Sequence, residues 1–188
     1  MNEYSIWLIP AEPWLGELRK IIERVAKENN TFSFEPHITI LVKNDEGGKM
    51  IKISEELAKQ ITKATARLTE IAYENTYFRA LYIKAQKQQL FQIHAIARKL
   101  AGMLADPSEP TPLGVKNTYV PHLSLLYGNL DEKTKRNIIK DLDIKLPMEV
   151  EFDKIELWRT GAQRTDASGV NQPAVDKWEK VVEISCQK

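Results

Sequence analysis

The chain has 188 residues, of which 43% are hydrophobic and 28% are charged, and we expect one globular domain spanning residues 1–188. A formal net charge of +1 argues against a long surface that follows nucleic acid, but it leaves room for a local basic cleft. The single cysteine, Cys186, excludes an intrachain disulfide and a cysteine-based metal site. No apolar run approaches the ~20 residues that cross a bilayer and no secretory signal is visible, so we expect a cytoplasmic protein without membrane contact.

The first half of the chain is predicted to alternate strands and helices. An apolar run at residues 4–9 ends at Pro10, which favours a buried strand. Apolar residues recur at helical spacing over residues 13–30, and Ser54 is a candidate N-cap for a helix over residues 55–67. Strands or extended segments complete this half at 36–42, 68–73 and 78–85.

The second half repeats much of this order. An apolar stripe indicates a helix over residues 88–104, and three prolines exclude a helix or a central strand at 106–112, where we expect a loop. The predicted elements that follow are strand 119–126, helix 131–142, strand 150–158, a polar loop at 160–172 and strand 178–185.

One short element occurs twice. Pro-His-Ile-Thr-Ile at residues 36–40 is echoed by Pro-His-Leu-Ser-Leu at residues 121–125, so two of the three histidines occupy the same frame. Side chains at i and i+2 of a strand share a face, while the apolar residues between them can anchor the opposite face in a core. The side chains that share a face are His37 with Thr39, and His122 with Ser124. If each half supplies one such strand, the two faces can meet across a cleft.

These residue types suit the opening of a cyclic phosphodiester. The reaction needs a base to activate water and an acid to protonate the departing ribose oxygen, and histidine, with a pKa of about 6.5, can serve as either near pH 7. The Thr39 and Ser124 hydroxyls can donate to the non-bridging phosphate oxygens. A zinc site is the rival interpretation, but zinc takes three or four ligands and no further His or Cys lies nearby in sequence. We therefore expect no metal and no other cofactor.

Other residues are weaker candidates. Trp7 and Trp158 could stack on a nucleotide base, but tryptophans in strands are more often core residues. Arg159 and Lys116 could meet a phosphate, although such side chains are usually solvated. His94 lies beside the apolar stripe of the third predicted helix and has no hydroxyl residue two positions later, so we expect a structural role.

The extended motifs resemble the 2H phosphoesterase superfamily, and within it the cyclic phosphodiesterases of the fungal and plant type. The similarity rests on Phe-Glu-Pro-His-Ile-Thr-Ile at 34–40 and on Tyr-Val-Pro-His-Leu-Ser-Leu-Leu-Tyr-Gly at 119–128. The first strand and the segment 155–160 followed by Trp178 are also similar to that family's first and near-final strands. The resemblance thus covers nearly the whole chain.

The resemblance implies an α+β, bilobal 2H phosphoesterase fold, with two pseudo-symmetric lobes that each hold an antiparallel sheet flanked by helices around a central groove. It implies hydrolysis of ADP-ribose 1″,2″-cyclic phosphate to ADP-ribose 1″-phosphate, and of nucleoside 2′,3′-cyclic phosphates to 2′-phosphates. His37 and His122 take the catalytic positions, Thr39 and Ser124 bind substrate, and Tyr127 falls on the family's aromatic position. Family analogy favours His122 as the base and His37 as the acid, although the two motifs are near equivalents.

Two features leave the substrate open. Tyr127 lies five residues after His122, so contact with substrate requires the strand end or a bend at Gly128. The stretch 161–173 is longer than expected between the last two strands, and it either lies over the groove or decorates the surface.

Two alternative functions stay open. A relative of the bacterial 2′-5′ RNA ligase branch would act on RNA ends and should carry a broader basic groove, against which the near-neutral charge counts. A non-catalytic nucleotide-binding module would not need a matched acid and base. We expect a monomer whose partner is a small cyclic-phosphate nucleotide, with RNA ends as the alternative substrate.

Overall fold

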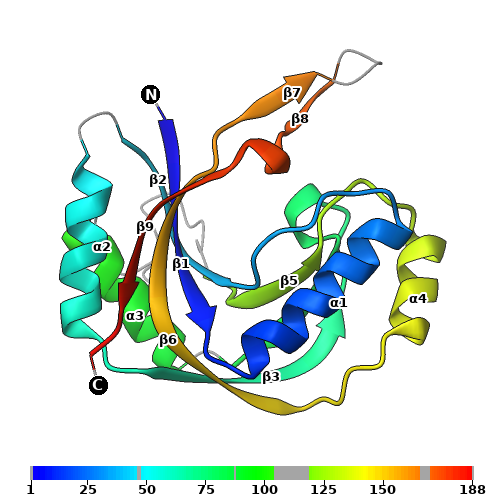
Figure 1. Ribbon diagram of the computed structural model, residues 1–188, viewed down its shortest axis with the longest axis horizontal. Helices are drawn as coiled ribbons and strands as arrows, with labels where there is room; N and C mark the ends of the chain where they lie inside the picture. Colours follow the sequence, from blue (N-terminus) through cyan, green and yellow to red (C-terminus); the bar gives the residue numbers. More distant parts are fainter. Residues whose placement is uncertain (1, 46–47, 87, 104–118, 166–169, 188) are drawn as a thin grey trace, which may run out of the picture.

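The computed structural model describes residues 2–45, 48–86, 88–103, 119–165 and 170–187, and its centre is a strongly curved antiparallel sheet (Figure 1). The strands of this sheet are β1 (Asn2–Pro10), β2 (Ile38–Asp45), β3 (Ala64–Ala72), β4 (Leu81–Ala85), β5 (His122–Leu126), β6 (Met148–Arg159) and β9 (Glu179–Ser185). Their spatial order is β1-β2-β5-β4-β3-β6-β9, with every neighbouring pair antiparallel. With the helices outside it, this sheet confirms the α+β class.

Strand β6 closes the sheet. Its first five residues pair with β3, and from Phe152 onward it pairs with β1. Six strands therefore form a closed, barrel-like ring, and β9 is added at the free edge of β6. The expectation of a separate sheet in each lobe is wrong, because one strand of 12 residues is long enough to join both halves of the chain.

The described part of the chain forms four α-helices outside the sheet: α1 (Trp14–Glu28), α2 (Lys49–Gln60), α3 (Gln88–Leu100) and α4 (Glu132–Asp141). Helix α2 contacts β6, β9 and α3, whereas α1 contacts β1 and β5. In Figure 1, α2 and α3 lie on one side of the molecule and α1 and α4 on the other. Among the described residues, no helix is both long and apolar enough to cross a membrane.

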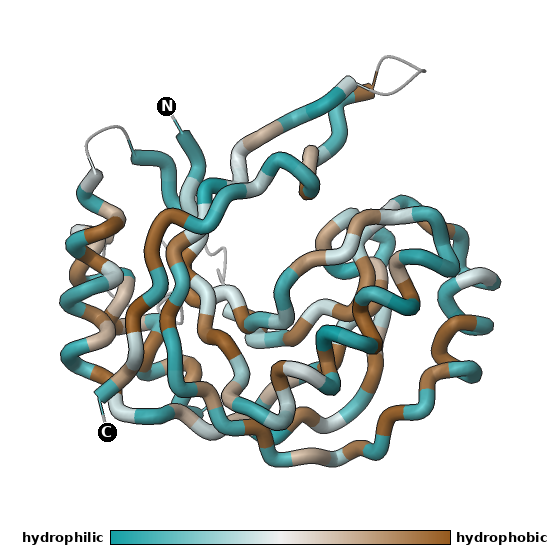
Figure 2. Tube along the Cα trace, viewed as in Figure 1, coloured by the Kyte–Doolittle hydropathy of each residue, from teal (hydrophilic) through white to brown (hydrophobic). Residues whose placement is uncertain are grey.

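The apolar residues of the two motifs enter the core as predicted. Ile38, Ile40, Leu123 and Leu125 are each at most 1% exposed. Figure 2 shows hydrophobic segments along the central strands, in contrast to the hydrophilic hairpin that projects from the body. Burying one such side chain contributes about 1.5–3 kcal/mol, and a shift of one residue would expose all four, so the core determines which face the motif side chains occupy.

The second helix lies earlier in the chain than predicted. It ends at Gln60, and residues 64–67 belong to β3. Ser54 is not an N-cap but lies within α2, where its hydroxyl donates to the Met50 carbonyl oxygen at 2.9 Å. The Asp45 carboxylate instead accepts a hydrogen bond from the Met50 N–H at 3.0 Å, which satisfies one of the unpaired donors at the helix start.

The polar stretch after β6 is a hairpin and not a plain loop. It contains β7 (Gln163–Thr165) and β8 (Asn171–Pro173), followed by the 3-10 turn η2 (Val175–Lys177). Arg164 of β7 lies over the Phe32 ring, 4.4 Å from its centroid, and forms an ion pair with Asp176. The stretch therefore reaches the segment that precedes β2. The loop expected at 106–112 and Lys116 lie outside the described residues.

Candidate active site

The two motif strands are neighbours in the sheet. Ile38 of β2 pairs with Leu123 of β5 in antiparallel register. In that register Thr39 lies across from His122, and His37 lies across from Ser124. Each histidine thus faces the hydroxyl residue of the other motif, and all four side chains share the face opposite the buried Ile and Leu residues.

A cavity of about 350 Å³ opens on this face. Side chains from β1 line one wall, because Glu3, Ser5 and Trp7 alternate along that strand and share a face. The complete lining consists of Glu3, Ser5, Trp7, His37, Thr39, Val42, Phe78, Arg79, His122, Tyr127, Thr160 and Trp178. The volume is within the range of small-ligand sites, and the walls are rich in aromatic rings.

Both imidazoles are held in the same way by their own motifs. His37 Nδ1 lies 2.6 Å from the Glu35 carbonyl oxygen, and His122 Nδ1 lies 2.7 Å from the Val120 carbonyl oxygen. Because a carbonyl oxygen only accepts, each Nδ1 carries the proton and donates it. The nitrogen that gains or loses a proton is therefore Nε2 in both rings, and either histidine can act as acid or base through that atom.

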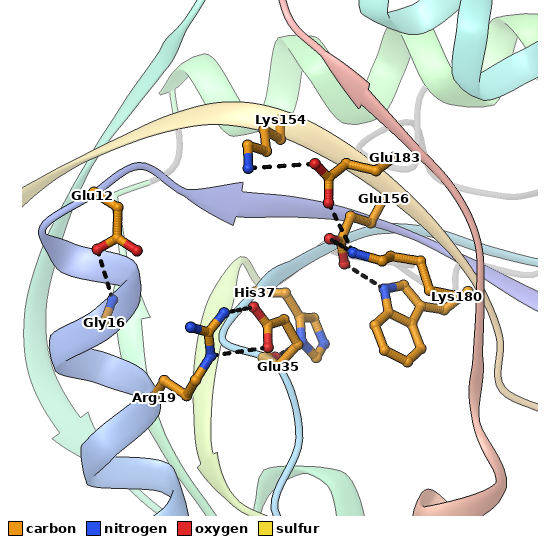
Figure 3. A network of polar contacts seen from close by, with 10 residues as sticks. Glu12, Gly16, Arg19, Glu35, His37, Lys154, Glu156, Lys180 and Glu183 are labelled. Carbon is orange, nitrogen blue, oxygen red and sulfur yellow. Dashed lines mark hydrogen bonds and ion pairs between the residues drawn. The ribbon is translucent and has the colours of Figure 1, made fainter.

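Aromatic and ionic contacts position His37 further. Its ring stacks on the Trp7 indole with a centroid distance of 3.6 Å and an interplanar angle of 6°. Glu35, whose backbone carbonyl oxygen accepts the hydrogen bond from His37 Nδ1, also forms an ion pair through its carboxylate with Arg19 of α1 (Figure 3). On the far side of Trp7 stacks Trp158, whose Nε1 donates to the buried Glu156 carboxylate at 2.6 Å. The orientation of His37 is thus supported from three elements, β1, α1 and β6.

Burial lowers the pKa of both histidines, because loss of hydration disfavours the imidazolium form. The pKa of His37 falls to about 3, with the bond to Glu35 opposing the shift and the nearby His122 adding to it. The pKa of His122 is also lowered, mainly by burial; the Val120 carbonyl and Glu74 oppose this shift and Arg79 adds to it. His37 is only 4% exposed and His122 is less deeply buried, so His122 accepts a proton more readily in the free protein.

The two hydroxyl residues have different surroundings. Thr39 lines the cavity beside Trp7, the residue of β1 with which it pairs in the sheet. Ser124 is 4% exposed and is not among the cavity-lining residues; its Oγ donates to the Phe78 carbonyl oxygen at 3.0 Å. Ser124 can therefore donate to a bound phosphate only after releasing that carbonyl.

Tyr127 lines the cavity although it lies an odd number of residues after His122. Gly128 follows with φ of 150°, and its N–H donates to the Tyr77 carbonyl oxygen at 3.0 Å. The Tyr127 ring stacks on Phe34 at 3.8 Å, and its hydroxyl lies 3.4 Å from His37 Nε2. Against β4, the register of β5 shifts by one residue between Ser124 and Leu126, and this irregularity changes the alternation that would turn Tyr127 away on a straight strand.

Arg79 and Trp178 line the cavity but were not predicted as site residues. Residues 78–85 were expected to be extended, whereas β4 begins at Leu81 and residues 77–79 form the 3-10 turn η1. This turn places Arg79 on the cavity wall. The buried Trp178 Nε1 has no hydrogen-bond partner among the described residues. An arginine just before a strand carries no local signal of this position, because the packing of η1 on β5 determines it.

Two of the weaker candidates, His94 and Arg159, lie outside the cavity. His94 is buried, stacks on Tyr119 at 4.1 Å and lies with Nδ1 2.6 Å from the Ile40 carbonyl oxygen, so it is a core residue as expected. Arg159 forms an exposed ion pair with Glu179 and does not line the cavity. Among the described residues, no group of three or more His, Cys, Asp or Glu side chains is placed to hold a metal ion.

Residues 1–185 match the family model described as cyclic phosphodiesterase-like protein. The cyclic phosphodiesterase of Arabidopsis thaliana is 27% identical over 138 residues, which cover 71% of this chain and 70% of that protein.

Solved structures share the fold at low identity. The structure of E. coli LigT complexed with 3′-AMP is 13% identical, with a TM-score of 0.57, and the similarity covers 100% of this chain and 99% of that one. The structure of TT0787 of Thermus thermophilus is 14% identical, with a TM-score of 0.60 and 98% of each chain covered.

Proposed function

The chain belongs to the cyclic phosphodiesterase-like family and is a phosphodiesterase, and on that premise we propose that it hydrolyses cyclic phosphodiesters of small nucleotides without a metal. The proposed substrates are nucleoside 2′,3′-cyclic phosphates, opened to 2′-phosphates, and ADP-ribose 1″,2″-cyclic phosphate, opened to ADP-ribose 1″-phosphate. The observation that carries the proposal is the pair of histidines, both held by Nδ1, on adjacent strands at one cavity.

The geometry supports acid–base catalysis through the two Nε2 atoms. One imidazole, in its neutral form, takes a proton from a water molecule while the water oxygen forms a bond to phosphorus. The other imidazole, in its protonated form, gives its proton to the ribose oxygen while the bond between that oxygen and phosphorus breaks. For a 2′,3′-cyclic phosphate the leaving oxygen is O3′ and the product is the 2′-phosphate. Each cycle consumes one water, and the two histidines exchange protonation states, which solvent then restores.

Both assignments of acid and base are compatible with this geometry. The lower pKa of His37 favours His37 as the base in the free protein. The Trp7 indole stacked on His37 favours the imidazolium form by a cation–π interaction of about 0.5–2 kcal/mol, which agrees with the family analogy that makes His37 the acid. The pH dependence of the two single variants, described in the Discussion, separates these assignments.

The cavity favours a mononucleotide over an RNA end. Its aromatic walls suit stacking on a base, and among the described lining residues Arg79 is the single Lys or Arg, whereas a groove that follows several nucleotides of an RNA backbone calls for more. We expect a 2′,3′-cyclic mononucleotide to be hydrolysed with a higher kcat/KM than an oligonucleotide ending in the same group. The reverse order would place the protein with the RNA-processing enzymes.

The first experiment is a turnover assay in the presence of EDTA. Because acid, base and hydroxyl donors are all side chains, we expect the chelator to leave the hydrolysis of 2′,3′-cyclic nucleotides unchanged. Release of the monophosphate, followed by chromatography or phosphorus NMR, measures this result. Loss of activity in EDTA and recovery with zinc or manganese would refute the mechanism, and absence of turnover under all conditions would favour a binding module.

Removing the hydroxyl donors is expected to slow the reaction less than removing a histidine. Thr39→Ala should lower kcat by about 10–10³, because a donor to the charge that develops on phosphate is lost. Ser124→Ala should lower kcat by the same factor or a smaller one, because the Ser124 hydroxyl already donates to the Phe78 carbonyl oxygen in the free protein. Thr39→Ser, which keeps the hydroxyl, is the control and should retain most of kcat. A Thr39→Ala variant with unchanged kcat would exclude this role.

A further inference from the structure

We propose that Arg79 binds the anionic phosphate of the substrate beside His122, and that Glu74 holds the guanidinium in the position to do so. This inference rests on the proposed function and adds an anion-binding residue outside the two repeated motifs. Arg79 here is a binding residue and Glu74 a positioning residue.

The charge distribution of the cavity requires a cation. A cyclic phosphodiester carries a negative charge, and the described lining contains the carboxylate of Glu3 together with neutral and aromatic side chains. Arg79 supplies the lasting positive charge among these lining residues, because both histidines are biased toward the neutral form by burial. Its side chain is 32% exposed, so it is partly removed from water yet open to a ligand.

The guanidinium is held before any ligand binds. Its Nη2 lies 2.8 Å from Glu74 Oε2, and the other carboxylate oxygen of Glu74 accepts from the Tyr82 hydroxyl at 3.1 Å. The Tyr82 ring meets the His122 ring edge-on with a centroid distance of 5.2 Å. One carboxylate thus connects the cation to the ring that packs against His122, and a guanidinium with five N–H donors can bind a carboxylate and a phosphate together.

The backbone around Arg79 is anchored as well. The Glu74 N–H donates to the Arg79 carbonyl oxygen at 2.9 Å. Lys135 of α4 is 1% exposed, and its ammonium donates to the Glu74 carbonyl oxygen at 2.8 Å and to Asn75 Oδ1 at 3.1 Å. Burial of a lysine head is costly unless it is paired in this way, and here the pairing holds the turn that carries Arg79. Such anchoring lowers the entropy that a phosphate contact would otherwise cost.

The pKa of His122 distinguishes this role of Arg79 from a merely structural one, because loss of a structural contact alone would not shift it. The charged and titratable groups around His122 are His37 from the first motif, Arg79 at the end of η1, Glu74 before η1, and Tyr82 and Lys84 on β4. Removing the positive charge at position 79 removes a cause that lowers the pKa of His122. The limb of the pH profile that belongs to His122 should therefore move to higher pH.

The test compares Arg79→Gln with Arg159→Gln, which removes an exposed, ion-paired arginine outside the cavity. For Arg79→Gln we expect KM for a 2′,3′-cyclic nucleotide and the inhibition constant of inorganic phosphate to rise about 10- to 100-fold, the range of a lost hydrogen bond to a charged group. We expect kcat to change less, and the His122 limb to move upward. Arg159→Gln should match the wild type in all three measurements.

Two further variants keep the proposal falsifiable. Arg79→Lys retains the charge and the Glu74 pair, and should restore the pH profile while recovering phosphate affinity only in part. Glu74→Gln frees the guanidinium and should raise KM by a smaller factor. Thermal melting identifies any variant that fails to fold, in which case Arg79→Lys carries the comparison. Unchanged KM, phosphate inhibition and pH profile in folded Arg79→Gln would overturn the proposal.

Failure of the proposed function gives a different result. If wild-type protein opens no cyclic phosphodiester, phosphate binding is measured by calorimetry. If Arg79→Gln no longer binds phosphate while Arg159→Gln still does, the anion site is supported although the protein lacks the activity. Equal phosphate affinity in the two variants refutes the anion site.

Discussion

Replacing either motif histidine by alanine is expected to lower kcat by roughly 10²–10⁴, the usual effect of losing a positioned acid or base. The structure supports an equal role for both, since each ring faces the same cavity with Nδ1 bound to a carbonyl oxygen two residues earlier in its own motif. Steady-state kinetics with a 2′,3′-cyclic nucleotide measure the effect, and KM should change less than kcat.

His94→Ala is the matched control for this prediction. His94 has the same kind of Nδ1 contact to a carbonyl oxygen, but it packs on Tyr119 in the core and does not line the cavity. Its replacement should reduce the melting temperature and leave kcat of the folded fraction near the wild-type value. A variant at position 37 or 122 with near-wild-type kcat would place the active site elsewhere.

The pH profile of kcat/KM is expected to be bell-shaped, with its optimum on the acidic side of 6.5. Activity needs one imidazole neutral and one protonated. In the free protein the pKa of His37 is about 3 and that of His122 is lowered from 6.5, so this state is most populated between the two values. Below that interval the base is protonated, and above it the acid has lost its proton. The two limbs give apparent pKa values of the coupled pair and not the pKa of either histidine alone.

Binding of substrate should move the alkaline limb upward. A phosphate anion in the cavity favours the imidazolium form and raises the pKa of the acid, so kcat should persist to higher pH than kcat/KM. In His37→Ala the residual rate should rise with pH if His122 is the base and fall with pH if it is the acid; His122→Ala should show the opposite trend. A wild-type profile that only increases from about pH 5 to 9 would indicate metal-bound water or hydroxide and contradict the two-histidine mechanism.

Much of the motif geometry could be predicted locally. Alternation along a strand is a property of the backbone, so the spacing of His37 and Thr39 determined that they share a face, and the apolar Ile38 and Ile40 determined which face is buried. The amphipathic pattern of α1 was equally informative, since its buried residues recur at helical spacing. These features depend on residues a few positions apart.

Other local signals failed because a distant partner competed with them. Ser54 has the side chain of an N-cap, but Asp45 accepts the Met50 N–H, and α2 therefore begins at Lys49. The polar residues after β6 indicated a loop, but the hydrogen bonds between β7 and β8 make a hairpin that reaches Phe32. In each case the preference of one residue was overridden by a hydrogen bond or contact formed elsewhere.

The sequence by itself determined the identity of the four motif residues, the side of the strand on which they lie, and the family. Only the tertiary structure decided that β2 and β5 are adjacent, so that each histidine lies across from the other motif's hydroxyl. It also decided that β6 joins both halves into one sheet and that the η1 turn brings Arg79 to the cavity. The pKa of His37 depends on every group that displaces water from it, including Trp7, Phe34 and Tyr127. Strand pairing and desolvation sum contributions from residues far apart in the chain, and a five-residue motif contains neither.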